Sequence, residues 1–596
     1  MTTDSSQKVP PRNPPWLPAH VLFWLFMGLA SAAVIVLGAI GFARNLEATE
    51  PNSNYSWPSL LFLAIQLFTA ESSVRPSPVG WELETARWLA LLVAGATVVQ
   101  GLIAIFGNRW NRFLLGRVRD HHIVCGYGSK GQTLVSDLVM EGDSVVLIAH
   151  QISAEELLEL DERRVLVVLG DARHAEILKM ASVERAQSVF VTCGDDASNV
   201  SITAGIMNYR QARCEPGRNA LHLYTHIGDP QLFQMLRNVE QASETTRAVE
   251  LKRFDTNHSG ARMHLRQWPV DYQRITQESP LEPRLLYAGW SLDSEALLLQ
   301  AARLCHLANG KKPQAHLIFA EATKTLSGLL FRYPQLESII DVHVHDVEPD
   351  TIDGQKIIKS LVEKCNSLTT LYIARQGDGV TLATGMGLKN ALLGINIPIF
   401  LQLEYTESIR AILERDTVLP ILRVYEGKHW AGRVAVVRQQ ELDRLAYNLH
   451  ANYLQLVHTQ KTTAKPGEWI EKPAHKPWAE LSEIYRADNR HSADHWEVKL
   501  RAIGCEMMEM EKANGKEPAT LTSDEIEVLA TMEHSRWNAS KWLDGWKLGP
   551  RNDATKQHDN LVTYDELSEK IKDYDRDTVR KMPNELAKMG WLIVRK

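Results

Sequence analysis

The feature that most constrains this chain is a stretch of 23 residues without a charged side chain, Val21–Ala43. As a helix rising about 1.5 Å per residue, it would be roughly 35 Å long, which is enough to cross a lipid bilayer. A cleaved signal peptide is the competing interpretation, but its apolar region is typically about 7–15 residues long. A second charge-free stretch, Trp88–Gly107, follows between Arg87 and Arg109. The sequence therefore predicts a hairpin of two membrane-spanning helices over residues 21–107.

The distribution of charge predicts the orientation of this hairpin. Lys8 and Arg12 lie in the N-terminal tail, residues 1–20, and a basic linker follows the second span at residues 108–119. The segment between the spans carries five acidic side chains: Glu47, Glu50, Glu71, Glu82 and Glu84. Because basic flanking segments stay in the cytoplasm, the tail and the linker are both expected there. The chain is thus predicted to be a multi-pass membrane protein with both termini in the cytoplasm.

A shorter apolar segment, Trp57–Ala70, lies between the two spans. It is too short to cross a bilayer and is typical of a re-entrant or interfacial helix. The order of span, short helix and span resembles the pore unit of two-helix potassium channels. That family has a glycine-rich filter after the short helix, whereas residues 68–73 here read Phe-Thr-Ala-Glu-Ser-Ser. Thr69 and Glu71 are the pore candidates, and Glu71 could either form a charged ring in an oligomer or be a solvated acid.

A glycine motif follows the basic linker. Gly126-Tyr-Gly128-Ser-Lys-Gly131 comes after an apolar run at 121–125, and a helical pattern and a second strand at 144–149 come after it. In this order, the first glycine allows a tight turn, the second lets the backbone approach a pyrophosphate, and the third allows close packing of the helix. The predicted phosphate contacts are Gly126, Gly128, Ser129, Lys130 and Gly131.

Two further predicted strands end in small and acidic residues. One begins at Val165 and ends in Gly170-Asp171-Ala172, and the next begins at Ser188 and leads into Gly194-Asp195. These residues are expected to line a ligand crevice, because ligands of parallel sheets bind beyond the carboxyl ends of the strands. Residues 120–235 resemble the Trk-type KTN/RCK domain, which is TrkA-N-like. This resemblance implies a cytoplasmic Rossmann-like domain that binds a dinucleotide or an adenine nucleotide and gates attached membrane helices.

The end of the second strand departs from that family. Members that bind NAD usually have an acidic residue there to hold the ribose hydroxyls, but this chain has Ala149, followed by His150 and Gln151. His150 is the candidate for contacting a ribose or a phosphate instead. The expected cofactor is an unidentified adenine nucleotide or dinucleotide, with NAD disfavoured. A degenerate domain without a ligand is the alternative.

Residues 280–430 alternate predicted strands and helices again, which indicates a second parallel sheet with flanking helices. This unit begins with Gly289-Trp-Ser291 and lacks a complete GxGxxG motif. It resembles the repeated Rossmann-like units of tandem regulatory arrays. We interpret it as a degenerate copy that serves assembly, with a second ligand site as the alternative.

The C-terminal residues 440–596 contain a tandem duplication. His450 and Tyr453 match His534 and Trp537, and the segment from Trp478 matches the segment from Tyr564. The second copy resembles the ryanodine receptor (RyR) repeat, which implies an α-helical domain that senses a nucleotide-derived signal. Aromatic faces and guanidinium groups suit a flat anion, although the same residues could fill a helical core. The predicted ligand contacts are His534, Trp537, Trp546, Arg551, Tyr564 and Arg576.

Composition narrows the function further. The net charge of −6 gives no indication of nucleic-acid binding, and the six cysteines form no CxxC pair or zinc spacing. No metal site and no catalytic residue are predicted. The resemblances imply a nucleotide-gated ion channel of a bacterial inner membrane, with four copies in a homo-oligomer. A non-conducting regulatory subunit of an ion transporter is the alternative. A membrane-tethered oxidoreductase is disfavoured, because no acid–base pair accompanies the glycine motif.

Overall fold

The computed structural model divides into two units, residues 1–117 and 118–596. It describes residues 19–596 apart from 50–54, 70–78, 214–218, 230–247 (except Leu232 and Met235), 365, 405–406, 414, 416–420, 439–441, 464–470, 479, 514 and 553. Within residues 19–22 and 100–114 it describes the backbone alone.

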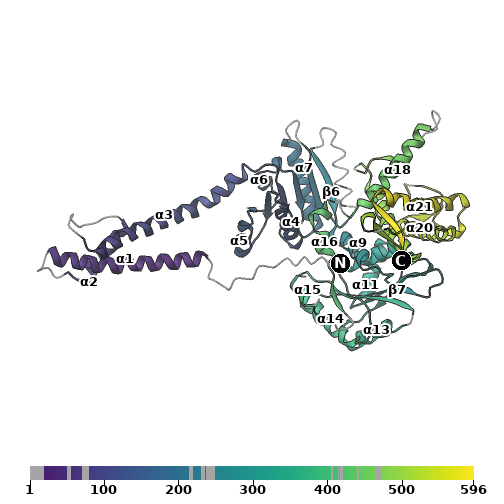
Figure 1. Cartoon of the computed structure of the whole chain (residues 1–596), viewed down its shortest axis with the longest axis horizontal. Coiled ribbons are helices and arrows are strands. Elements are labelled where there is room, and N and C mark those ends of the chain that lie inside the picture. Colours follow the sequence, from purple (N-terminus) through teal and green to yellow (C-terminus); the bar gives the residue numbers. More distant parts are fainter. Residues whose placement is uncertain are drawn as a thin grey trace. The chain divides into compact units, whose positions relative to one another are not determined.

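The N-terminal unit consists of helices. These are α1 (Ala19–Thr49), α2 (Trp57–Gln66), η1 (Leu67–Thr69) and α3 (Trp81–Leu115). The two long helices lie side by side, and α2 packs on α1 (Figure 1). Glycines allow this close approach: a Cβ at Gly41 would lie 2.7 Å from the Cβ of Leu83, and a Cβ at Gly38 would lie 3.1 Å from that of Ala64.

One helix of the described residues, Phe23–Thr49, is long and apolar enough to cross a membrane, and Trp57–Thr69 is a shorter apolar helix. The second predicted span, residues 88–107, lies within α3. Because its side chains from residue 100 onward fall outside the described residues, this span stays a prediction.

The first sheet of the larger unit has six parallel strands in the order β3-β2-β1-β4-β5-β6. The strands are β1 (His122–Cys125), β2 (Val145–Ala149), β3 (Leu166–Leu169), β4 (Ser188–Val191), β5 (Leu221–His226) and β6 (Val249–Phe254). Its helices include α4 (Ser129–Met140), α5 (Ala154–Glu162), α6 (Ala175–Met180) and α7 (Asp196–Arg213). This is the strand order of a Rossmann fold, and β6 lies beyond the range 120–235 that the sequence predicts for this domain.

The second sheet also has six parallel strands, in the order β12-β11-β10-β7-β8-β9. The strands are β7 (Glu282–Gly289), β8 (Gln314–Ile318), β9 (Asp341–His345), β10 (Ser367–Ala374), β11 (Ile399–Leu401) and β12 (Leu422–Val424). Its helices are α10 (Leu292–Leu304), α11 (Ala322–Arg332), α12 (Leu336–Ile339), α13 (Ile352–Val362), α14 (Asp378–Ala391) and α15 (Glu407–Leu413). Numbered from its own first strand, this order is the same as that of the first sheet, so the chain contains two Rossmann-like sheets in tandem.

The C-terminal part repeats one arrangement of two helices and a strand. The first copy is α18 (Arg444–Thr463), α19 (Glu483–Ala502) and β13 (Cys505–Glu509). The second copy is α20 (Ser523–Leu543), α21 (Glu569–Lys588) and β16 (Trp591–Arg595), with two short strands, β14 (Lys547–Leu548) and β15 (Gln557–His558), between its helices. The strands β13 and β16 pair in an antiparallel ladder, which joins the two copies.

Buried ion pairs attach this C-terminal part to α9 (Thr256–Gln267), the helix that follows the first sheet. Arg262 of α9 donates to Asp443 at 2.8 Å and to Asp494 of α19 at 2.7 Å, and its side chain is 3% exposed. Arg490 of α19 bonds to the second oxygen of Asp443 at 2.5 Å. Such buried charges are stable only as a paired set, so α9 and α19 are held together.

A second attachment joins the short helices α16 (Gly427–Ala431) and α17 (Val434–Val437) to the helix of the glycine motif. The backbone N–H of Val434 donates to Asp137 of α4 at 3.0 Å. Val434 and Val437 are buried in the same core as Leu134 and Leu138 of α4. The segment between the second sheet and the C-terminal repeats therefore packs directly on α4.

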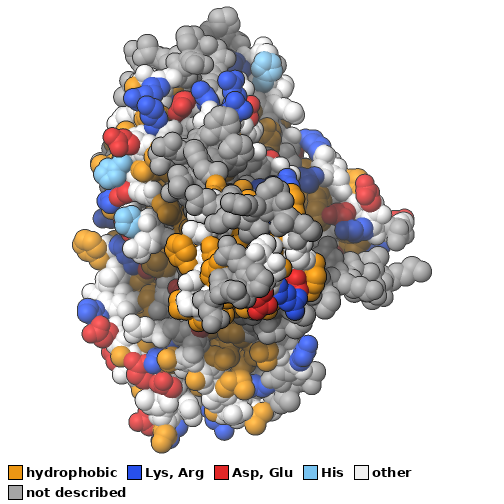
Figure 2. Space-filling view, turned by 90° about the vertical axis from the view of Figure 1, so that its left-hand side faces the viewer, with side chains coloured by type: hydrophobic (Ala, Val, Ile, Leu, Met, Phe, Trp, Pro, Cys, Tyr) orange, Lys and Arg blue, Asp and Glu red, His pale blue; other side chains and the backbone are white. Residues whose placement is uncertain are grey.

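The surface in Figure 2 shows basic and acidic side chains interspersed rather than gathered by sign. This agrees with the small net charge of −6.

Candidate functional site

The glycine turn after β1 has the backbone geometry that a phosphate site requires. Gly126 has a φ of +100°, in the region that favours glycine. A Cβ at Gly131 would lie 2.0 Å from the carbonyl oxygen of Gly126. At Gly128, the N-cap of α4, a Cβ would meet nothing within 4 Å. Gly126 and Gly131 are thus needed for the turn itself, whereas Gly128 leaves open space at the amino end of α4, where an anion is stabilised.

Lys130, next to this turn, acts electrostatically on groups at the ends of β5 and β6. Ser129 is exposed and Lys130 is half-buried in the first turn of α4. Burial, together with the charges of Lys130 and Arg253, lowers the pKa of His226 at the end of β5 to about 3. Burial raises the pKa of Asp255, the N-cap of α9, and Lys130 opposes that rise. Lys130 therefore places a cation within electrostatic reach of His226 at the end of β5 and of Asp255 at the start of α9.

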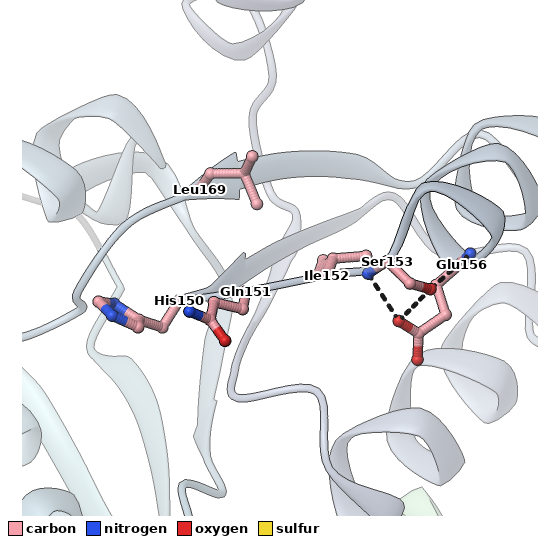
Figure 3. Close-up of a pocket in the computed structure, with 6 residues that line it drawn as sticks. All are labelled: His150, Gln151, Ile152, Ser153, Glu156 and Leu169. Carbon is pink, nitrogen blue, oxygen red and sulfur yellow. Dashed lines mark hydrogen bonds between the residues drawn. The ribbon is translucent and has the colours of Figure 1, made fainter.

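An open hollow of about 670 Å³ lies at the ends of β2 and β3. It is lined by His150, Gln151, Ile152, Ser153, Glu156 and Leu169 (Figure 3). Ala149 itself is buried in the sheet, with 5% of its surface exposed. The predicted contact His150 therefore shares this hollow with a carboxylate, Glu156, which is not among the predicted contacts because it comes from the helix after the strand.

The end of β3 presents an ion pair. Gly170 has a φ of +155°, and Ala172 is buried. Asp171 accepts hydrogen bonds from Nε and Nη2 of Arg173 at 2.9 and 2.6 Å. These bonds lower the pKa of Asp171 to about 2. Arg173, whose side chain is 55% exposed, is a cation that the sequence prediction missed, because its position beside Asp171 depends on the fold of the loop.

The end of β4 lies close to this pair, since Asp195 acts electrostatically on Arg173. Gly194 has open space around its Cα, and exposed Asp195 accepts from the backbone N–H of Ser198 at 2.8 Å. Buried Asn199 accepts from the N–H of Cys193 at 2.8 Å and donates to its carbonyl at 3.1 Å. Asn199 thus fixes the backbone at the end of β4, and its amide also donates to the carbonyl oxygen of His226 at the end of β5, at 3.0 Å.

The two C-terminal copies build matching histidine environments. His450 Nε2 lies 2.7 Å from the carbonyl oxygen of Lys476, and His534 Nε2 lies 2.9 Å from that of Val562. The ring of His450 lies 6.0 Å from those of Tyr453 and Trp478. The ring of His534 lies 5.7 Å from Trp537 and 6.1 Å from Tyr564. The predicted correspondence between the copies is thus also a correspondence of contacts.

Residues 122–213 match the TrkA-N domain. Residues 520–595 match the RyR domain. The TrkA-N match contains the glycine turn, the hollow and the polar ends of β3 and β4, and the RyR match contains the second C-terminal copy. These are the two resemblances that the sequence motifs indicate.

Three curated relatives are named as potassium channels. Probable potassium channel protein 2 of Methanocaldococcus jannaschii is 34% identical over 89 residues, covering 14% of this chain and 25% of the relative. Potassium channel protein 1 of the same organism is 34% identical over 88 residues, covering 15% and 26%. The voltage-gated potassium channel Kch of Escherichia coli is 25% identical over 134 residues, covering 20% and 32%. The chain thus matches between a quarter and a third of the length of these relatives.

Similar solved structures include GsuK bound to ADP, with a TM-score of 0.34 and 13% identity, covering 70% of this chain and 99% of that one. The GsuK channel bound to NAD has a TM-score of 0.37 and 11% identity, covering 72% and 86%. The human SLO3 gating ring has a TM-score of 0.36 and 8% identity, covering 58% and 85%.

In the second sheet, Gly289 and Ser291 lie at the end of the first strand as Gly126 and Gly128 do in the first sheet. A Cβ at Gly289 would lie 1.9 Å from the carbonyl oxygen of Ala374. The hydroxyls of Ser291 and Ser294 donate to Gln402 at 2.6 and 3.0 Å. Ser291, which follows Gly289 as Gly128 follows Gly126, is thus bonded to Gln402, whereas a Cβ at Gly128 would meet nothing within 4 Å.

Three histidines of the second sheet stack at its edge. The ring of His316 on β8 lies 4.7 Å from that of His343 and 5.4 Å from that of His345, both on β9. Burial, followed by the charges of the two neighbouring histidines, lowers the pKa of His316 to about 3. Over the described part of the chain, no group of three or more His, Cys, Asp or Glu side chains is arranged to hold a metal ion.

Within the RyR domain, the predicted contacts fall into different environments. Trp537 lies 4.9 Å from the ring of His558, which in turn lies 6.2 Å from Trp546. Lys541 lies over the ring of Trp546, at 5.3 Å. The sequence prediction names neither His558 nor Lys541. These aromatic rings lie close together, and the ammonium of Lys541 beside them also donates to Asp488 at 2.8 Å.

The remaining ligand contacts predicted for the RyR domain are Arg551, Tyr564 and Arg576, and they lie in other surroundings. Arg551 is exposed. Buried Tyr564 donates to Glu527 at 3.2 Å. The guanidinium of Arg576 donates to Glu527, Glu569 and Asp573 at 2.6, 2.8 and 3.1 Å. Arg576 would have to leave these carboxylates to bind a phosphate.

Of the two pore candidates, Thr69 is described and is the last residue of η1. The hydroxyl of Thr69 donates to the carbonyl oxygen of Gln66 at 2.8 Å. Glu71 lies outside the described residues, so its role stays a prediction.

Proposed function

We propose that this chain is the subunit of a nucleotide-gated membrane protein of the potassium-channel type. The observation that carries the proposal is the open glycine turn at the amino end of α4, within the stretch that matches the TrkA-N domain. An adenine nucleotide would place its phosphates at Gly128, where backbone N–H groups and the helix dipole stabilise negative charge. Its adenosine would extend toward the hollow at the ends of β2 and β3.

The helical unit supports a membrane location. Large apolar side chains are exposed on α1, including Phe26 at 68% and Leu29 at 71%. On α3, Trp88 is 68% and Leu92 is 69% exposed. Exposed apolar surface of this kind suits lipid or another subunit. The proposed topology has two spans, with both termini on the cytoplasmic side of a bacterial inner membrane.

An oligomer is part of the proposal, because a hairpin of two spans cannot enclose a pore by itself. Four copies would place four short α2 helices around one axis, as in the channel pore unit that the segment order resembles. A closed ring with rotational symmetry is expected, because most homo-oligomers have closed symmetry.

Coupling between the ligand and the membrane helices would begin at α4. The helix contacts α17 through Asp137 and its apolar face, and Lys130 acts on the N-cap of α9. A nucleotide that binds one arrangement of these helices more tightly shifts the population toward it, by the difference in binding free energy. The alternative function is a non-conducting regulatory subunit of an ion transporter, which would bind the same ligand without a conductance of its own.

A Glu71→Gln variant is expected to change the conductance or the cation preference of the reconstituted protein, because it removes the carboxylate that would face the pore. The measurement is a current recording in planar bilayers under potassium and sodium gradients. The matched control is Glu47→Gln, which removes a charge from the end of α1. Currents of Glu71→Gln that equal those of the control would remove Glu71 from the pore.

The RyR domain is expected to bind a nucleotide independently of the TrkA-N domain. In a Gly128→Asp background, which removes the first site, a nucleotide at 100 times its dissociation constant should stabilise the fold by about 2.7 kcal/mol. Arg551→Ala should weaken this effect, whereas Arg580→Ala, at an exposed arginine of α21, should not. Thermal unfolding of the full chain, with and without nucleotide, measures this stabilisation. If no nucleotide shifts the transition, the C-terminal copies are structural.

A further inference from the structure

The hollow at the end of β2 contains one acidic side chain, Glu156, which comes from helix α5 rather than from the strand. Ala149 ends β2 with a buried methyl group, so the strand supplies no carboxylate. Glu156, in the first turn of α5, lines the hollow together with His150 and Gln151 (Figure 3). The helix after the strand thus brings a carboxylate to the region that the strand end leaves uncharged.

The hydrogen bonds of Glu156 hold this carboxylate in one position. Its oxygen Oε2 accepts from the backbone N–H of Ser153 at 2.9 Å and from the Ser153 hydroxyl at 2.7 Å. The N–H of Glu156 donates back to that hydroxyl at 3.2 Å, which completes a capping box. The second oxygen, Oε1, has no hydrogen-bond partner among the described residues. One lone-pair-bearing oxygen is therefore available to a ligand while the other anchors the side chain.

The carboxylate of Glu156 is charged at neutral pH, and its charge acts on the side chain of Tyr127. The bonds from Ser153 lower the pKa of Glu156 below its usual value. Burial raises the pKa of Tyr127, which lies between Gly126 and Gly128, and the charges of Glu159 and Glu156 raise it further. The Tyr127 side chain thus lies within electrostatic reach of two carboxylates of α5, Glu159 and Glu156.

The residues that line the hollow contain no lysine or arginine. A ribose with free 2′ and 3′ hydroxyls can donate a hydrogen bond to a carboxylate oxygen, whereas a 2′-phosphate brings a like charge beside it. The charge in the hollow therefore favours the hydroxyls of a ribose diol over a phosphate group.

We propose that Glu156 takes the place of the missing acid at the end of β2, so that the site selects adenine nucleotides with an unmodified ribose diol and rejects 2′-phosphorylated ones. This rests on the proposed nucleotide site at Gly128. NAD is thereby restored as a candidate ligand, beside ADP and ATP, while NADP is excluded. Glu156 is a specificity residue here, and the phosphate contacts stay with the glycine turn.

The test compares ligand pairs that differ only in the 2′-phosphate: NAD with NADP, and AMP with adenosine 2′,5′-bisphosphate. Calorimetry on the purified full chain should give at least about tenfold tighter binding of the unphosphorylated member of each pair, as expected for one like-charge contact. Glu156→Gln keeps the capping interaction, since Gln also occupies this position of a capping box, and should reduce the preference to about twofold or less. Glu159→Gln removes the same charge one turn along α5 from a residue outside the hollow and should leave the preference unchanged.

The outcomes separate this inference from the function on which it rests. If the 2′-phosphorylated ligands bind as tightly as their partners, and Gly128→Asp abolishes binding of both, the nucleotide site stands and the role of Glu156 is wrong. The same conclusion follows if Glu156→Gln and Glu159→Gln change the preference equally. If none of the four ligands binds the wild-type chain, the nucleotide site itself fails.

Discussion

A Gly128→Asp variant is expected to bind ADP and NAD at least about 100-fold more weakly than the wild-type chain, because like charges at close range cost several kcal/mol. The new side chain meets no protein atom within 4 Å of its Cβ, so the turn can form. Its carboxylate would then occupy the space where the phosphates are proposed to lie. Isothermal titration calorimetry of the purified full chain measures the loss.

The control for this variant is Gly328→Asp. Gly328 lies within α11 of the second sheet, and a Cβ there also meets nothing within 4 Å. The same change in size and charge is thus made at an open helical position far along the chain from the glycine turn. Nucleotide affinity that is unchanged in Gly128→Asp, or reduced equally in both variants, would contradict the proposed phosphate site.

A Glu533→Gln variant is expected to destabilise the C-terminal domain by about 3–5 kcal/mol, the usual result of removing one partner from a buried charged group. Glu533 of α20 accepts from Lys499 of α19 and from Arg536, at 2.7 Å for the latter. Lys499 has no exposed side-chain surface, and that of Arg536 is 4% exposed. The amide keeps the size of the side chain, so the loss reports the missing negative charge between two buried cations.

Urea unfolding followed by tryptophan fluorescence measures this loss, because Trp496, 2% exposed, lies on the same helix as Lys499. The control is Glu509→Gln, which removes the partner of Lys512 in a pair whose side chains are 42% and 74% exposed. That change is expected to cost less than about 1 kcal/mol. A Glu533→Gln variant as stable as this control would mean that the buried charges do not hold the two copies together.

The apolar runs predict β1 to β4 because these strands are short, largely buried and separated by helical patterns. The strand β6 was missed, since Val249–Phe254 has three charged residues among its six and lies beyond the range 120–235 predicted for the domain. The strand β12 has only three residues, which is too few for a periodic signal. The identical strand order of the two sheets depends on long-range pairing and could not be read from local sequence.

For the candidate site too, local features could be predicted from the sequence, and contacts made by tertiary packing could not. Gly126 and Gly131 could be predicted because each answers a local backbone requirement, such as the 2.0 Å approach at Gly131, and Gly128 because the motif needs space for a phosphate there. The partners of charged side chains could not, because tertiary packing decides them. Arg576 illustrates this: the sequence predicts a phosphate ligand, and the structure surrounds its guanidinium with carboxylates from α20 and α21. Glu156 is the opposite case: the sequence does not predict it as a contact, and it becomes a candidate because α5 places it in the hollow.

Nucleotide binding in the TrkA-N domain is proposed to control an ion conductance that this chain forms. The most direct test records potassium currents from the purified wild-type protein in planar bilayers while ADP or NAD is added to the cytoplasmic side, with Gly128→Asp in parallel. The account predicts a wild-type conductance that changes on addition of nucleotide and a Gly128→Asp conductance that does not respond. A wild-type protein that binds nucleotide yet conducts under no condition would contradict the channel and favour the non-conducting regulatory subunit.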